Sequence, residues 1–209
     1  MAPTGSPGRR RSFNIVALAI LVLAIAVVAR SHRGPLHTYG ASVQRVVLTA
    51  GGLGERLPVT LVRPAGAPAG RPLLVLLSPD PEDPGGTLSS GLFAALHDLG
   101  GSAPTLALPG GPARAYTGAD AGAWRSYLLR VVIPAASSKL DANPRRVAIG
   151  GVGAGGPVAA SVVRSASASL CGAALTGVRT SPSTEAAWRQ YLGVYANALA
   201  RCRSATSTA

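Results

Sequence analysis

The feature that most constrains this chain is a glycine-rich turn between an apolar segment and a segment with helical periodicity. The run Val147–Ile149 is bounded by arginines on one side and glycines on the other, which predicts a buried strand. Beyond the glycines, small and β-branched residues recur at helical spacing over Pro157–Val163. The stretch therefore predicts a strand, a tight turn and a helix.

Three interpretations of this turn are open. Gly151-Val152-Gly153-Ala154-Gly155 has the frame of a nucleophile elbow, G-x-S-x-G, with glycine at the nucleophile position. Gly151, Gly153 and Gly156 also match the dinucleotide fingerprint G-x-G-x-x-G, which holds a pyrophosphate at a helix N-terminus. The third interpretation is a packing turn, in which glycine only lets the strand and the helix approach closely.

The dinucleotide interpretation is poorly supported by the rest of the chain. Such a site needs an acidic residue about twenty positions beyond the glycines to bind a ribose hydroxyl, and Leu170–Thr176 contains none. Arg179 would suit a phosphorylated ribose, but several predicted strands precede the fingerprint instead of following it. We therefore expect no cofactor.

The charge balance is strongly basic, with 20 Lys and Arg residues against 8 Asp and Glu and a formal net charge of +12. Apart from Arg9–Arg11 the basic residues are scattered, and few aromatic side chains are present to stack on bases. This pattern argues against nucleic-acid binding. It is compatible with a position beside an anionic membrane.

The N-terminal region predicts membrane targeting. Residues 1–12 form a basic tail expected to be disordered, and residues 13–29 are apolar except for Asn14, long enough to span about 25 Å as a helix. Val27 and Ala29 also suit a signal-peptidase site, so a signal anchor and a cleaved signal peptide both remain open. The preceding arginines favour a body outside the cytoplasm in either case.

A spacer, residues 30–41, leads to a globular body, residues 42–209. Apolar runs with turn residues between them predict five strands and one further candidate: Ser42–Thr49, Arg56–Arg63, Leu73–Leu77, Thr105–Leu108, Val147–Ile149 and the candidate Ser169–Thr176. Helical periodicity starts at Leu88 and at Trp124, the latter ending near Pro134, and a last helix is predicted over Glu185–Ala200. Strands alternating with helices after an antiparallel pair indicate an α/β fold with a mostly parallel sheet.

Five stretches follow one another in an order known from one enzyme family: Val59–Pro64, Leu73–Leu77, Thr105–Gly111, Tyr116–Pro134 and Asp141–Gly156. This order resembles that of the esterase-type α/β-hydrolases, the group that includes esterase D and the secreted mycolyltransferases. The last stretch is similar to the family's G-x-S-M-G-G, with Gly153 in place of serine and Ala154 in place of methionine. The resemblance implies an α/β-hydrolase fold and ester hydrolysis or acyl transfer.

The departures from the family concern its catalytic residues. The triad acid and histidine follow the elbow in that family, whereas the only acidic residue after Gly153 is Glu185 and no histidine follows. Ser78-Pro79 stands where the family usually has His-Gly beside the oxyanion hole. We therefore expect a degenerate domain, short at its C-terminal end and without the triad.

Substitute residues are few. Ser78 is a weak candidate nucleophile, while Ser161 lies two turns into the helix and should not reach the elbow. The available bases are His32, His37 and His97, the first two in the spacer. The acidic residues Asp80, Glu82 and Asp83 have no histidine or cysteine nearby, so we expect a solvated loop and no metal site.

The sequence therefore predicts an extracytoplasmic, non-catalytic hydrolase-like protein that binds an envelope lipid, ester or glycan. The alternative is an active esterase or acyltransferase with an unorthodox nucleophile. Cys171 and Cys202 either form a disulfide, which an extracytoplasmic location permits, or remain a buried strand residue and a free thiol.

Overall fold

The computed structural model describes residues 36–166, 170–171 and 182–205. The chain divides into two units, 1–36 and 37–209, and all that follows concerns the second. The predicted tail and apolar run, and most of the candidate strand Ser169–Thr176, lie outside the described residues. None of the helices within the described residues is long and apolar enough to cross a membrane.

The centre of the unit is a five-stranded sheet with the order β1-β2-β4-β3-β5. Its strands are β1 (Ser42–Ala50), β2 (Glu55–Arg63), β3 (Arg71–Leu77), β4 (Thr105–Pro109) and β5 (Ala142–Gly151). The pairs β1–β2 and β2–β4 are antiparallel, and the pairs β4–β3 and β3–β5 are parallel. The sheet within the described residues is therefore mixed, not mostly parallel, because both hairpin strands pair antiparallel at one edge.

The predicted hairpin is confirmed with its register running from Ser42 opposite Arg63 to Ala50 opposite Glu55. The turn is closed by a 3-10 segment, Gly51–Leu53, and by Gly54 at φ 69°. A side chain is strained at such a positive φ, so glycine is the residue suited to this position.

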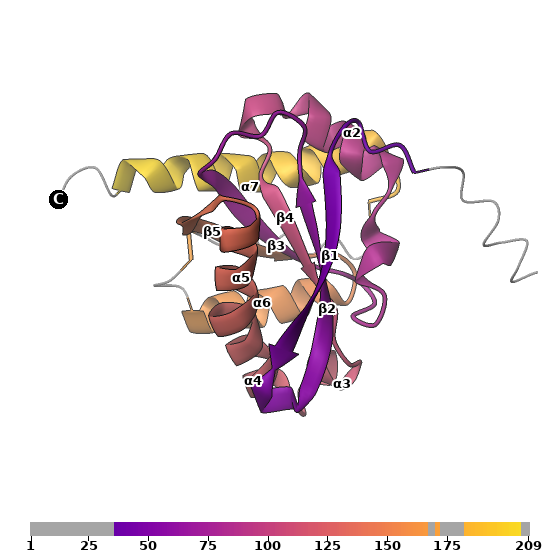
Figure 1. Cartoon of the computed structure of the whole chain (residues 1–209), viewed down its shortest axis with the longest axis vertical. Helices are drawn as coiled ribbons and strands as arrows, with labels where there is room; N and C mark the ends of the chain where they lie inside the picture. The colour runs from indigo at the N-terminus through magenta and orange to yellow at the C-terminus, as the bar shows by residue number, and fades with distance from the viewer. Residues whose placement is uncertain (1–35, 167–169, 172–181, 206–209) are drawn as a thin grey trace, which may run out of the picture. The chain divides into compact units, whose positions relative to one another are not determined.

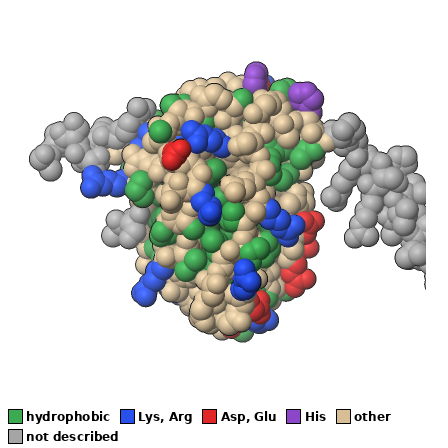
Figure 2. Space-filling model, viewed as in Figure 1, with side chains coloured by type: hydrophobic (Ala, Val, Ile, Leu, Met, Phe, Trp, Pro, Cys, Tyr) green, Lys and Arg blue, Asp and Glu red, His purple; other side chains and the backbone are tan. Residues whose placement is uncertain are grey.

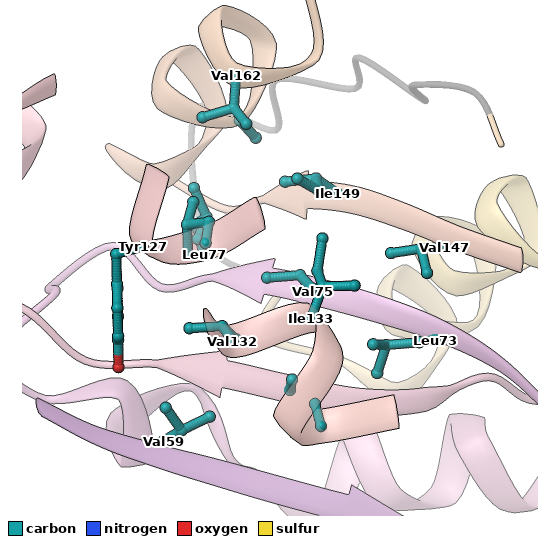
Figure 3. Close-up of a cluster of buried hydrophobic side chains, with 14 of the residues drawn as sticks. Val59, Leu73, Val75, Leu77, Tyr127, Val132, Ile133, Val147, Ile149 and Val162 are labelled. Atoms are coloured by element: carbon teal, nitrogen blue, oxygen red, sulfur yellow. The ribbon is translucent and has the colours of Figure 1, made fainter. Parts of the chain in front are cut away.

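Strand β3 is buried on both faces, as its uninterrupted apolar run predicts. Because successive side chains alternate, Leu73, Val75 and Leu77 point into one hydrophobic cluster, whereas Leu74 and Leu76 point into another. Figure 3 shows the first cluster, in which β3 side chains lie among those of β5 and the helices that cover this face. The unit thus has three layers, with the sheet between two sets of helices.

The helices divide between these two faces (Figure 1). One face is covered by α2 (Ser90–Asp98) and α7 (Glu185–Ala205), which pack against each other. The other face is covered by α4 (Ala121–Tyr127), α5 (Ile133–Lys139) and α6 (Gly155–Ala166), with the short α3 (Arg114–Thr117) before them. Further 3-10 turns occur at Pro84–Thr87 and Gly100–Ser102.

Several predicted helix boundaries were wrong. The second helix begins at Ala121 instead of Trp124, and the last one extends to Ala205 instead of ending at Ala200. Helix α2 begins at Ser90 instead of Leu88, because the Ser89 hydroxyl accepts a hydrogen bond from Leu92 N (3.2 Å) and caps the helix. The second helix does not end near Pro134 but continues to Lys139. A π-helical turn, Leu128–Val132, precedes the proline, which lies in the first turn of α5, where a missing N–H is tolerated.

Basic side chains are dispersed on the face of the molecule drawn in Figure 2, among apolar and uncharged ones. The acidic side chains visible there lie mostly at one edge. The basic side chains on this face do not form a continuous stripe.

Candidate functional site

The glycine-rich turn is a sharp strand-to-helix connection, as predicted. Strand β5 ends at Gly151, and Val152 N donates to the Leu77 carbonyl of β3 at 3.0 Å. Gly153 then adopts φ 55°, and α6 begins at Gly155. Gly155 N and Gly156 N donate back to the carbonyls of Val152 and Gly153, which closes the turn.

Residues 151 and 155 must be glycine, because other backbone atoms lie too close to leave space for a Cβ. A Cβ at Gly151 would fall on the Gly155 carbonyl, and a Cβ at Gly155 would fall on the Leu77 carbonyl. Such overlaps cannot be relieved by a side-chain movement, because the atoms concerned belong to the backbone. The flanking glycines thus keep the geometry of an elbow and also act as the packing turn that the sequence left open.

The central position of the turn faces Pro79. A Cβ at Gly153 would lie 3.0 Å from the Pro79 Cβ and 3.4 Å from its Cγ, tighter than ordinary van der Waals contact. Pro79 also lacks an N–H, so it offers no backbone donor toward the turn. The space in which a nucleophile side chain would stand is therefore restricted by the loop after β3.

Two tyrosines of α7 pack under the end of β5. Tyr191 Oη donates to the Gly151 carbonyl at 3.1 Å and lies 3.3 Å from Tyr195 Oη. Burial raises the pKa of Tyr191 well above its usual value, and the neighbouring Tyr195 raises it further. The Tyr191 hydroxyl therefore remains protonated at neutral pH and serves as a structural hydrogen-bonding group.

The weak candidate Ser78 is fully buried at the start of the loop that follows β3. Its hydroxyl donates to the Asp80 carbonyl, a bond that holds the loop and not a substrate. The nearby Tyr116 has a pKa raised by burial, only partly offset by the Ser78 hydroxyl. Within the described residues, Ser78 therefore lacks both solvent access and a basic partner.

The two described histidines lie away from the turn. His37 and His97 both contact the Tyr39 ring, with centroid separations of 4.3 and 5.6 Å, and His97 Nδ1 lies 3.6 Å from an oxygen of Asp98. The acidic residue after the turn, Glu185, pairs with Arg189 at 2.6 Å. The described residues thus do not bring a histidine or Glu185 to Gly153, and His32 lies outside them.

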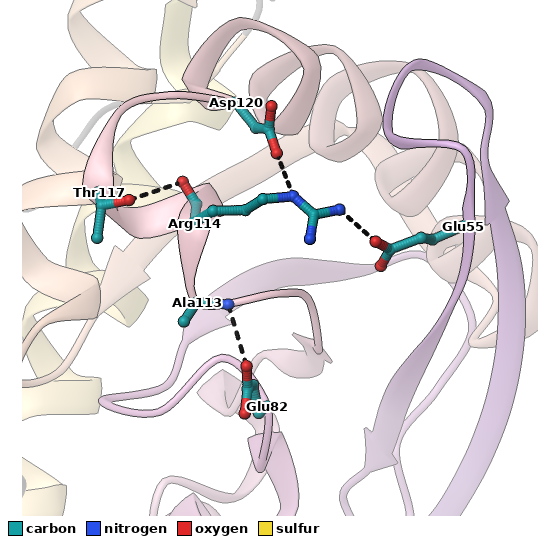
Figure 4. Close-up of polar contacts among 6 residues, drawn as sticks. All are labelled: Glu55, Glu82, Ala113, Arg114, Thr117 and Asp120. Atoms are coloured by element: carbon teal, nitrogen blue, oxygen red, sulfur yellow. Dashed lines mark hydrogen bonds and ion pairs between the residues drawn. The ribbon is translucent and has the colours of Figure 1, made fainter.

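The acidic residues after β3 stabilise a loop. Asp80 accepts from Glu82 N at 2.9 Å, and Asp83 caps the turn that follows by accepting from Gly86 N at 3.1 Å. Glu82 accepts from Ala113 N at 3.3 Å, as Figure 4 shows. No cluster of metal-binding side chains occurs among the described residues.

Figure 4 also shows a small ion-pair network that secures α3. Arg114 pairs with Glu55 of β2 and, through Nε at 2.6 Å, with Asp120 just before α4. These side chains are partly exposed, so the network orders the α3 region and adds little stability.

A pocket of about 180 Å³ lies between α3, α4 and the first turns of α6. Its lining is mainly apolar and includes Tyr116, Trp124, Arg125, Val158, Ser161 and Val162. Ser161, which the sequence placed too far along the helix to act at the turn, is thus part of this pocket wall. We call this cavity the α4–α6 pocket.

Aromatic side chains form one wall of the α4–α6 pocket. The Trp124 ring lies 6.2 Å from that of Tyr116 and 5.5 Å from that of Tyr127. Burial raises the pKa of Tyr127 to about 12. Arg125 contributes a positive charge to an otherwise largely apolar lining. This pocket could not be found from the sequence, because its walls come from separate helices.

A disulfide joins Cys171 and Cys202, whose Cα atoms are 5.5 Å apart. Cys171 N also donates to the Val147 carbonyl of β5 at 2.8 Å, which places this cysteine beside the strand. The bridge therefore links the segment beside β5 to α7.

No family model matches the chain. No curated protein matches it either.

Solved esterase structures do resemble the chain. A bacterial heroin esterase aligns with a TM-score of 0.53 and 19% identity, covering 70% of this chain and 46% of the esterase. A thermostable esterase from Pseudomonas putida aligns with a TM-score of 0.51 and 16% identity, covering 72% and 47%. A ferulic acid esterase aligns with a TM-score of 0.52 and 16% identity, covering 76% and 70%.

The chain spans about half the length of the first two of these esterases. At such low identity the likeness concerns the fold alone. Together with the mixed sheet, the flanking helices and the strand–turn–helix at Gly153, it shows that the described body of this chain has an α/β-hydrolase-like fold.

Proposed function

We propose that this protein is a non-catalytic member of the esterase-type α/β-hydrolases, the group that includes esterase D and the secreted mycolyltransferases. The observation that carries the proposal is the position of Pro79 beside Gly153: the turn has no nucleophile side chain, and a Cβ there would lie only 3.0 Å from the Pro79 Cβ. Burial of Ser78 and the distant contacts of His37 and His97 support the same conclusion.

The proposed activity is retention of a ligand in the α4–α6 pocket. Its size and its aromatic and aliphatic walls suit an acyl chain or an aromatic ester group, and Arg125 suits an anionic end of the same molecule. An envelope lipid, ester or glycan carrying such a group is therefore the ligand class we propose.

Hydrolysis of an ester and retention of a ligand are measured on the same full-length protein. We expect p-nitrophenyl butyrate to be hydrolysed no faster than in buffer, while lipid or glycan that co-purifies with the protein is detected by mass spectrometry. Turnover that is lost in Ser78→Ala would overturn the proposal and identify Ser78 as an unorthodox nucleophile.

A pocket-filling variant tests the location. Ser161→Phe places a ring in the α4–α6 pocket, whereas Ser165→Phe adds the same ring at another exposed position of α6 that does not line it. We expect co-purified ligand to be lost in the first variant and kept in the second. Equal retention in both would contradict the assignment of the pocket.

We also propose that the body lies outside the cytoplasm, held by or released from the N-terminal apolar segment. Arg9–Arg11 before that segment support this orientation, and the disulfide suits an oxidising compartment. Protease added to spheroplasts should digest an anchored body. Full protection of an intact body would refute the topology.

A further inference from the structure

A second pocket, of about 300 Å³, lies at the amino ends of β3 and β5. It is at the opposite end of the sheet from the turn at Gly153, which follows the carboxyl end of β5. The residues that matter for its chemistry are Arg71, Arg146, Ser102 and Asn197. We call it the arginine pocket.

Arg71 is the first residue of β3, and only 6% of its surface is exposed. Its Nη1 donates to the carbonyls of Gly100 and Ala103, both at 2.8 Å, and its Nε is buried without a hydrogen-bond partner among the described residues. None of the ion pairs between described residues includes Arg71. A guanidinium is therefore buried without a compensating carboxylate, which is costly.

The nearby charges do not remove this excess. The Asp141 carbonyl accepts a hydrogen bond from Gly70 N, beside Arg71, but the Asp141 carboxylate pairs with Arg63 at 3.1 Å. Burial lowers the pKa of Arg71, and the positive charge of Arg63 lowers it further. An arginine keeps its proton even so, because its unperturbed pKa is far above neutrality.

A register irregularity brings a second arginine to the same pocket. Arg71 is opposite Ala142, but Leu73 is opposite Val147, so β5 contains more residues than β3 between these two pairs. The additional residues end with Arg146, whose Nη2 donates to the Leu199 carbonyl of α7 at 3.3 Å. Both arginines thus line one cavity together with Ser102 and Asn197.

Capping explains only part of this arrangement. The two carbonyls bound by Nη1 belong to the turn after α2, and a helix end of this kind is often held by arginine. Capping does not account for the burial of net positive charge beside a polar cavity. An anion in the cavity does, because it supplies the missing countercharge.

We propose that the arginine pocket binds a phosphate group between Arg71 and Arg146. A phosphate offers several acceptor oxygens, which match two guanidinium groups, a hydroxyl and an amide better than a single carboxylate does. The group belongs either to a small soluble phosphate ester or to a phospholipid headgroup. This inference is independent of the α4–α6 pocket and of whether the protein is an enzyme.

The soluble source is tested with the purified full-length protein. At constant ionic strength, inorganic phosphate or glycerol 3-phosphate at about ten times its Kd should raise the Tm by roughly 3–6 °C relative to chloride. Arg146→Gln should weaken this binding by about 10- to 100-fold, and Asn197→Ala should weaken it several-fold. Arg164→Gln removes the same charge from an exposed position on α6 and should leave binding unchanged.

The headgroup source is tested with phosphatidylcholine vesicles with and without phosphatidylglycerol. Binding to the anionic vesicles that falls in Arg146→Gln but not in Arg164→Gln would assign the site to a headgroup. A Tm shift with soluble phosphates alone would assign it to a free ester. The proposal is overturned if neither probe binds, or if Arg146→Gln and Arg164→Gln lose binding equally, since only general charge would then be at work.

Discussion

Pro79 lies against Gly153, so the loop after β3 occupies the side of the turn from which a nucleophile side chain would project. A Cβ at Gly153 would be 3.0 Å from the Pro79 Cβ, and the backbone there has φ 55°. Two separate obstacles, a strained backbone and a tight contact, therefore oppose any side chain at this position.

Gly153→Ser should accordingly destabilise the protein and not create a hydrolase. We expect the free energy of unfolding to fall by about 1–3 kcal/mol, measured by chemical denaturation. Hydrolysis of p-nitrophenyl esters should stay at background, because a serine without a histidine is a weak nucleophile. A burst of acyl-enzyme would show that a histidine such as His97 reaches the turn, and would contradict our account.

Gly54→Ser tests the effect of a strained backbone without a tight contact. Gly54 also has a positive φ, 69°, but a Cβ there would meet nothing within 4 Å. We expect this variant to lose less stability than Gly153→Ser. Replacing Pro79 with glycine should recover part of the loss in the Gly153→Ser background but not in the Gly54→Ser background.

Gly150→Ala should destabilise the protein through the tyrosines of α7. A Cβ at Gly150 would overlap the Tyr195 hydroxyl and lie 2.9 Å from the Tyr191 hydroxyl. We expect a loss of about 1–3 kcal/mol on chemical denaturation, as for other overpacked core positions. Tyr195→Phe should relieve part of this loss, and an unchanged stability of Gly150→Ala would refute the packing described here.

Gly193→Ala, in α7, is the control for a glycine-to-alanine change that meets no neighbour. A Cβ at this position would meet nothing within 4 Å, and alanine has the higher helix propensity. We expect this variant to gain up to about 1 kcal/mol.

Stability should decrease above pH 10. Burial raises the pKa values of Tyr116, Tyr127 and Tyr191, so the folded state favours the protonated phenols. For Tyr127 the contribution is complete below pH 10, the usual pKa, and is lost as the pH rises to about 12. Denaturation curves at pH 8, 10 and 11.5 should show the decrease, and it should be smaller in Tyr127→Phe.

At neutral pH two tyrosine-to-phenylalanine variants should differ. The Tyr127 hydroxyl is buried without a hydrogen-bond partner among the described residues, so its removal should cost little or even stabilise. Tyr191→Phe removes the hydrogen bond to the Gly151 carbonyl and should cost about 1–2 kcal/mol. Equal effects in the two variants would contradict these assignments.

Reduction of the disulfide should lower the stability of the body. The bridge joins cysteines 31 positions apart, and closing a loop of that size stabilises by about 3–4 kcal/mol in the chain-entropy model. Alkylation under denaturing, non-reducing conditions should label no thiol. Two labelled thiols would rule the bridge out, and Cys171→Ala/Cys202→Ala should match the stability of the reduced protein.

The sequence by itself determined the local elements of this protein. Apolar runs and turn residues located the hairpin, the buried strand β3 and the strand–turn–helix at Gly153, because these features depend on residues close together in the chain. The order of the elements also indicated the hydrolase-like fold. The continuation of the second helix beyond Pro134 was missed, because a π-helical turn there accommodates the proline.

Only the tertiary structure decided what surrounds the central turn and the pockets. Pro79 and Gly153 are far apart in the sequence, as are Arg71 and Arg146, and sheet pairing of β3 with β5 brings each pair to the same end of the sheet. The pattern of apolar residues fixes which side of a strand is buried, but the register and the adjoining loops fix which side chains meet. That is why the sequence predicted a turn without a nucleophile, and the fold alone placed a proline against it.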